Sequence, residues 1–140
     1  MGNCLKVGIL GAGNIAGSMA EALNELQKEG KACAYAVASR SQEKALEFAR
    51  KWNITRAYSS YEELASDPEV DLIYIATPHS LHYEQAKLCM EHGKNVLVEK
   101  AFTANARQAE ELFAMAEEKK VFITEAIWTL SLIHISEPTR

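Results

Sequence analysis

The sequence has 140 residues, a length that suits one domain rather than two. Its hydrophobic content of 48% and charged content of 24% predict a packed core, and the net charge of −4, with acids and bases interspersed, argues against a nucleic-acid-binding surface. No apolar stretch is long enough to span a bilayer and no signal peptide is evident, so we expect a cytoplasmic protein in which Cys4, Cys33 and Cys89 are reduced thiols.

Apolar runs alternate with helical patterns along the chain, which is typical of an α/β protein. The expected strands are Leu5–Leu10, Cys33–Ser39, Thr55–Tyr58, Val70–Ala76, Asn95–Val98 and Val121–Thr124. The expected helices begin at Asn14, Ser41, Ser60, Ser80 and Asn105, and those from Asn14 and Ser80 run to about Glu29 and His92. This pattern predicts a doubly wound parallel sheet of the Rossmann type in the strand order 3-2-1-4-5-6. It would form a single three-layer α/β/α domain with its ligand crevice at the carboxyl ends of the strands.

Three of these helices carry apolar residues at helical spacing, and we expect those residues to be buried. They are Ile15, Met19, Leu23 and Leu26 in the first helix, Ala45, Phe48, Ala49 and Trp52 in the second, and Ala109, Leu112, Phe113 and Ala116 in the last.

The turn after the first strand, Gly11-Ala12-Gly13, matches the strand, glycine-rich turn and helix of a dinucleotide-binding site. Gly11 can make the tight turn, and Gly13 has no side chain to keep a pyrophosphate away from the backbone. The amides at the helix start, at Asn14 and Ile15, would then hold the phosphates. A tight turn in an ordinary α/β domain is the alternative interpretation.

The end of the second strand is the position that distinguishes the two nicotinamide cofactors. An Asp or Glu there favours NAD, but this sequence has Ser39, Arg40 and Ser41. A guanidinium can pair with the 2′-phosphate of NADP, and the serines add hydroxyl donors. We therefore predict a preference for NADP, with NAD as the weaker ligand. The alternative is that Arg40 is a solvated surface charge.

The fourth strand is followed by Thr77 and Pro78, which would border the cofactor crevice, and by His79 and His82 near it. His82 shares a helical face with Cys89 and His92, a spacing that suggests a metal site. Because no fourth ligand accompanies them, we predict no metal and expect ordinary histidines on the helix surface.

The fifth strand is followed by the pair Glu99-Lys100, at the edge of the sheet where substrates bind. A lysine that is partly shielded from water beside a carboxylate can hold a substrate hydroxyl and help to move its proton. The alternative is a surface ion pair of little energetic value.

Together these residues resemble the amino-terminal domain of the Gfo/Idh/MocA oxidoreductases, from Leu5 to about Thr129. The resemblance rests on the turn that begins at Gly11, on Ala76-Thr77-Pro78 with His82 following, and on Glu99-Lys100. The segment Glu125-Ala126-Ile127-Trp128-Thr129 is most similar to the branch of dimeric dihydrodiol dehydrogenases and related sugar dehydrogenases.

The resemblance implies hydride transfer between NADP and a secondary alcohol of a sugar, polyol or diol. It makes Lys100 the catalytic residue in contact with substrate and nicotinamide, and it places Glu99, Thr77, Pro78 and His82 at the cofactor. Trp128 would lie near the mouth of the active site. It further implies a homo-oligomeric full-length protein. Most members of the family have Pro where this chain has Ala101, so the loop after Lys100 departs from the family pattern.

The resemblance also implies a second α/β domain, which we do not expect within these 140 residues. We expect a dinucleotide-binding domain over residues 1–129. The tail over residues 130–140 departs from the family pattern, and our hypothesis is that it is translated adapter or vector sequence joined to a truncated gene. Half of the active site would then be absent, and we expect little or no turnover from this chain alone.

Two other functions are weighed against this one. A non-catalytic NAD(P)-sensing module would use the same cofactor site, but it would not require Glu99-Lys100. A methyltransferase with a nucleoside cofactor also permits a glycine-rich first turn, but it explains neither Arg40 nor Glu99-Lys100.

Overall fold

The computed structural model describes residues 4–99 and 106–126, apart from the side chains at positions 14, 79, 125 and 126. Within these residues six parallel strands form one sheet in the order β3-β2-β1-β4-β5-β6, as the sequence predicts. The strands are β1 (Leu5–Leu10), β2 (Ala32–Ala38), β3 (Arg56–Tyr58), β4 (Leu72–Ile75), β5 (Asn95–Glu99) and β6 (Ile123–Ala126). The helices are α1 (Asn14–Lys28), α2 (Gln42–Trp52), α3 (Tyr61–Ala65), α4 (His82–Glu91) and α5 (Ala106–Lys119), with a short 3-10 turn, η1 (His79–Leu81), before α4.

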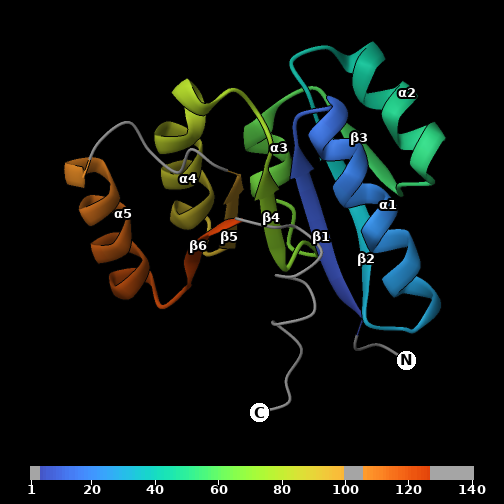
Figure 1. Ribbon diagram of the computed structural model, residues 1–140. Coiled ribbons are helices and arrows are strands. Elements are labelled where there is room, and N and C mark those ends of the chain that lie inside the picture. Colours follow the sequence, from blue (N-terminus) through green and yellow to red (C-terminus); the bar gives the residue numbers. More distant parts are fainter. Residues whose placement is uncertain (1–3, 100–105, 127–140) are drawn as a thin grey trace.

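Two apolar clusters lie on opposite faces of the sheet. Helices α1 and α2 pack on one face with Ile9 and Tyr74, whereas α3, α4 and α5 pack on the other with Ile73 and Ile75 (Figure 1). Ile73, Tyr74 and Ile75 follow one another in β4 and are each 0% exposed, because strand side chains alternate and both faces are covered. The predicted doubly wound α/β fold is confirmed.

Several expected element limits are wrong by one or two residues. The last strand begins at Ile123 rather than Val121, because Lys120, the residue after the end of α5, lies in the left-handed region at φ 60°. The Val121 N–H then donates back to the Ala116 carbonyl at 3.0 Å, which keeps Val121 in the helix-terminating turn. Similarly, β4 begins at Leu72 because the Val70 N–H is used in a turn, where it donates to the Asp67 carbonyl at 3.2 Å.

Two of the side chains expected in the buried helix faces lie on the surface instead. Ile15 is 51% exposed and Phe113 is 52% exposed. In each helix the buried stripe runs through the adjacent residue, Ala16 (0% exposed) and Leu112 (1% exposed), and one residue corresponds to a rotation of about 100° around the helix. The small side chain of Ala16 lets the start of α1 pack closely against the sheet.

Serine hydroxyls cap two of the helices as the sequence predicts. Ser41 Oγ accepts the Lys44 N–H at 3.2 Å, and Ser60 Oγ accepts the N–H groups of Glu62 and Glu63 at 3.1 and 3.3 Å. The expected cap of α5, Asn105, and the expected tail over residues 130–140 lie outside the described residues. Within the part of the chain that the structure describes, no helix has the length and apolar character needed to cross a membrane.

Candidate functional site

The carboxyl ends of the parallel strands converge at one edge of the sheet, and a cleft of about 420 Å³ opens there. It is lined by residues that follow β1, β2 and β4, together with the starts of α2 and α3. These residues are Gly11, Ala12, Gly13, Ser39, Arg40, Ser41, Lys44, Tyr61, Ala76, Thr77, Pro78 and Leu81. The cleft therefore brings together most of the residues predicted from the sequence to meet a cofactor.

The glycine-rich turn forms the floor of this cleft. Gly11 has φ +107°, and a Cβ there would lie 3.0 Å from the Ala76 carbonyl oxygen, so only glycine fits without strain. Gly13 is different, since its φ of −94° and ψ of −163° are open to any residue and a Cβ there would meet nothing within 4 Å. The backbone at Gly13 is thus bare and faces open space.

Helix α1 begins at this turn with its amide groups unsatisfied by side chains. Its N-cap residue is Gly13, no described side chain caps it, and its first turn holds no acidic residue. By contrast, α2 and α3 have serine caps and acidic residues in their first turns. The positive end of α1 is therefore available to an anion in the cleft.

The loop after β2 supplies the charge of the cleft. The Ser41 N–H donates to Ser39 Oγ at 3.3 Å, and the Ser41 hydroxyl caps α2, which fixes the loop between them. Arg40 and Lys44 are exposed on this loop and at the start of α2. Among the described residues that line the cleft, these two are the charged ones and both are cations.

Lys44, Tyr61 and Leu81 line the cleft but were not singled out from the sequence. Lys44 had a usable signal, because it stands three residues after the capping Ser41 and so in the first turn of the helix that follows Arg40. No sequence signal marked Tyr61 and Leu81, since both resemble ordinary residues at the starts of helices.

His82 is not the surface histidine that the sequence led us to expect. It is 1% exposed and lies behind the wall of the cleft, where its Nε2 contacts the Thr77 carbonyl oxygen at 2.8 Å. The turn η1 directly precedes α4, so His82 is the first residue of that helix, and its ring packs against the Thr77 backbone rather than facing solvent. Cys89 is also buried and His92 is exposed. No group of three or more potential metal ligands occurs among the residues that the structure describes.

Ile15 of α1 is exposed beside the glycine turn, while the side chain of Asn14 lies outside the described part of the chain. Glu99 ends β5, and its carboxylate accepts a hydrogen bond from the hydroxyl of Tyr74, which is 0% exposed in the neighbouring β4. This contact was not foreseen, because a tyrosine in an apolar strand reads as core. Lys100, next in sequence, and Trp128 lie outside the described residues, so their roles stay predictions.

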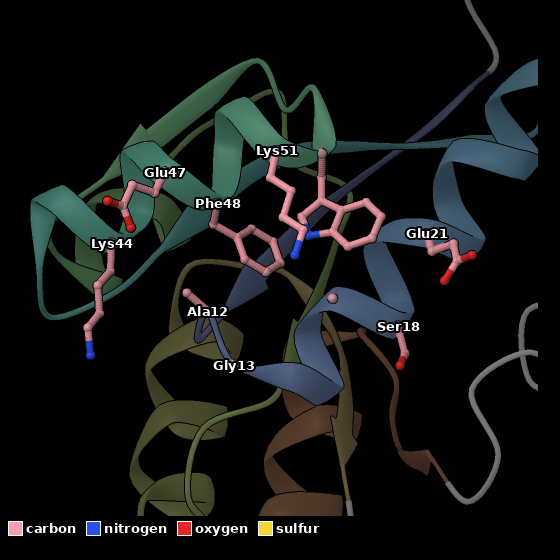
Figure 2. Close-up of a pocket in the computed structure, with 10 residues that line it drawn as sticks. Ala12, Gly13, Ser18, Glu21, Lys44, Glu47, Phe48 and Lys51 are labelled. Carbon is pink, nitrogen blue, oxygen red and sulfur yellow. The ribbon is translucent and has the colours of Figure 1, made fainter.

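A second hollow, of about 510 Å³, lies between α1 and α2 and shares Ala12, Gly13 and Lys44 with the cleft. Figure 2 shows Phe48 and Lys51 of α2 on one side of this groove and Ser18 and Glu21 of α1 on the other. Its remaining lining residues are Gly17, Glu47 and Trp52. Because its charged side chains are exposed and of both signs, the groove has no preference for an anion, unlike the cleft.

Comparison with known proteins connects this geometry to a family. Residues 5–126 match the Gfo/Idh/MocA family model, described as an oxidoreductase family with an NAD-binding Rossmann fold. The chain is 45% identical over 125 residues to trans-1,2-dihydrobenzene-1,2-diol dehydrogenase from Mus musculus, covering 89% of this chain and 37% of that protein. It is 40% identical over 134 residues to D-xylose 1-dehydrogenase (NADP(+)) from Hypocrea jecorina, covering 89% and 34%.

Among solved structures, the 3-ketoreductase KijD10 from Actinomadura kijaniata, in complex with TDP-benzene and NADP, superposes with a TM-score of 0.81 at 32% identity. The match covers 88% of this chain and 38% of that one. The chain thus spans little more than a third of the length of the curated relatives that it matches. The strand order, the glycine-rich turn and the family match agree, and this chain belongs to the Gfo/Idh/MocA oxidoreductase family, whose NAD-binding Rossmann fold it forms.

Proposed function

We propose that this chain is the NADP-binding domain of an oxidoreductase that transfers a hydride between the nicotinamide and a secondary alcohol of a sugar, polyol or diol. The observation that carries the cofactor choice is the pair of cations, Arg40 and Lys44, at the end of the cleft where NAD-preferring folds place a carboxylate. No Asp or Glu is present among the described residues that line the cleft. A 2′-phosphate fits such a site, because its charge is neutralised there rather than repelled.

The residues present also fit the rest of a dinucleotide. The bare backbone at Gly13 and the free amide end of α1 suit the pyrophosphate. Tyr61, Pro78 and Leu81 supply an aromatic ring and apolar surface on the other side of the cleft, which suits the adenine. The dinucleotide, when bound, supplies the hydride acceptor or donor.

The chemical step is assigned to the strand edge next to the cleft. The Tyr74 hydroxyl holds Glu99 at the end of β5, and Lys100 follows it directly in the sequence. In the proposed role the Lys100 ammonium holds the substrate oxygen and exchanges its proton as the carbon–hydrogen bond forms or breaks. The substrate class is supported by two of the relatives, a dehydrogenase of a dihydrodiol and a dehydrogenase of D-xylose.

The test is a binding titration of the 140-residue chain with NADPH and NADH, followed by intrinsic cofactor fluorescence. We expect NADPH to bind at least tenfold more tightly, which corresponds to one charge-assisted hydrogen bond to the 2′-phosphate. Arg40→Asp should reverse the preference. Lys44→Ala should lower the affinity for NADPH about tenfold and leave the affinity for NADH unchanged.

The matched control is Lys51→Ala, which removes an equally exposed cation of α2 that faces the groove of Figure 2 instead of the cleft. Its affinity for both cofactors should stay within about twofold of the unmodified chain. Tighter binding of NADH by the unmodified chain would overturn the NADP assignment. Turnover of a sugar or diol by the whole protein, lost in Lys100→Ala while NADPH affinity is kept, would exclude a non-catalytic sensing module.

A further inference from the structure

Ala76, Thr77 and Pro78 form one wall of the cleft, beside the glycine turn, and two buried hydrogen bonds from α4 hold this wall. Thr77 Oγ1 donates to Gln85 Oε1, and His82 Nε2 lies 2.8 Å from the Thr77 carbonyl oxygen. A carbonyl oxygen can only accept, so Nε2 carries the proton of that bond. Thr77, Gln85 and His82 are 8%, 6% and 1% exposed, and water therefore competes little with either bond.

This wall has little freedom to move without changing the cleft. The Ala76 N–H donates to the Leu10 carbonyl at 2.9 Å, which ties the start of the wall to β1. The Leu81 N–H donates to the Pro78 carbonyl at 2.9 Å, which closes the turn on the other side. A Cβ at Gly11 would lie 3.4 Å from Thr77 Cγ2, so the wall is already packed against the glycine turn. The position of Thr77 therefore sets the distance between the two sides of the cleft.

The Thr77 hydroxyl has a single proton, and Gln85 accepts it. Thr77 therefore does not donate to a molecule in the cleft while this bond is intact. The hydroxyl oxygen can still accept a hydrogen bond, but its donated bond is committed to Gln85 and acts on the position of the backbone at 76–78. His82 likewise acts on this backbone, which it contacts from behind, and is not part of the cleft lining.

We propose that Gln85 and His82 are positioning residues for the dinucleotide, which hold the wall of the cleft in its binding geometry by clamping Thr77 from α4. This inference rests on the proposed NADP site. It assigns Thr77 an indirect role, in which its hydroxyl orients the wall instead of contacting the cofactor. The clamp leaves the cleft preformed before the ligand arrives, which lowers the ordering cost of binding.

A double-mutant cycle on the 140-residue chain tests the clamp, with the dissociation constant of NADPH as the readout. The variants are Thr77→Val, Gln85→Met and the double variant, which removes both polar groups and leaves neither one unpaired. We expect each of the three to weaken NADPH by the same factor, about fivefold to tenfold, because each breaks the same bond. Thr77→Ser keeps the hydroxyl and should restore affinity to within about twofold.

His82 is tested by a pair of substitutions. His82→Gln places an amide donor at a similar reach and should keep most of the NADPH affinity, whereas His82→Leu removes the donor and should weaken binding as Gln85→Met does. Thermal unfolding of every variant is measured alongside. The control is Tyr83→Phe, which removes a hydrogen bond from α4 to Glu111 on α5, away from the cleft, and should leave NADPH affinity unchanged.

The outcomes separate this inference from the proposed function. If the double variant weakened NADPH binding by the product of the two single factors, Thr77 would contact the cofactor directly, and the clamp would be overturned. Unchanged affinity in Gln85→Met, with tight binding by the unmodified chain, would overturn it as well. Affinity that follows thermal stability in all variants, Tyr83→Phe included, would show a general structural effect and refute the positioning role. Absence of NADPH binding by the unmodified chain would instead overturn the proposed function itself.

Discussion

The two glycines of the turn before α1 should respond in opposite ways to the addition of a single methyl group. Gly11→Ala places a Cβ at φ +107° and 3.0 Å from the Ala76 carbonyl oxygen. A residue with a side chain in such a conformation costs about 1–3 kcal/mol, and the contact with a backbone atom in a packed strand adds to this cost. We expect Gly11→Ala to lower the free energy of unfolding by about 2–4 kcal/mol.

Gly13→Ala is the matched comparison, two residues further along the same turn. Its φ of −94° is ordinary and the new Cβ would meet nothing within 4 Å. We expect a change in stability within about 0.5 kcal/mol, since the loss of a glycine N-cap and the reduced freedom of the unfolded chain nearly cancel. The methyl group would, however, occupy the approach of the pyrophosphate, so NADPH affinity should fall at least tenfold.

Urea unfolding followed by circular dichroism measures the stabilities, and titration of cofactor fluorescence measures the affinities. Equal destabilisation by the two substitutions would refute the assignment of strain to Gly11. Unchanged NADPH affinity in a folded Gly13→Ala variant would refute the assignment of the open space above Gly13 to a phosphate.

Three further predictions concern stability and reactivity. Ser60→Ala should destabilise the chain by about 1 kcal/mol, because Ser60 Oγ accepts two amide N–H groups of α3; the exposed neighbour Ser59→Ala is the control in urea unfolding, and equal effects would contradict the cap. Burial alone would raise the pKa of Asp67, but the Tyr58 hydroxyl and the Glu69 N–H, with the charges of Arg56 and Lys94, hold this pKa below its usual value. The resulting stability is present above about pH 4 and is lost as the pH falls through the lowered pKa. Tyr58→Phe should therefore reduce the loss of unfolding free energy between neutral and acidic pH, and an unchanged pH dependence would refute the Tyr58–Asp67 hydrogen bond as its source. Burial raises the pKa of the Cys89 thiol to about 12, so a thiol reagent at pH 8 should label Cys89 only after unfolding in urea, and rapid labelling in the absence of urea would contradict its burial.

The order of the elements and the location of the cleft could be predicted from the sequence because the signals are local. The period of the apolar residues distinguishes strand from helix, and Gly11, Ser41 and Ser60 mark turns and helix starts through their own backbone chemistry. Parallel connections then place the ends of β1, β2 and β4 on one edge, which is why Gly13, Arg40 and Thr77 line the same cleft.

Tertiary packing decided which side chains of each helix face the sheet and which of them line the cleft. Whether Ile15 or Ala16 faces the sheet depends on the rotation of α1, which is set by how closely helix and strand can approach. His82 is buried because α4 begins directly after η1, with the His82 ring against the Thr77 backbone. Lys44 and Tyr61 line the cleft because α2 and α3 pack on opposite faces of the sheet with their first turns near its edge. The sequence alone thus determined the chemistry available at each strand end, whereas the packing of the helices decided which of those groups meet, because contacts between elements far apart in the chain leave no periodic trace in either one.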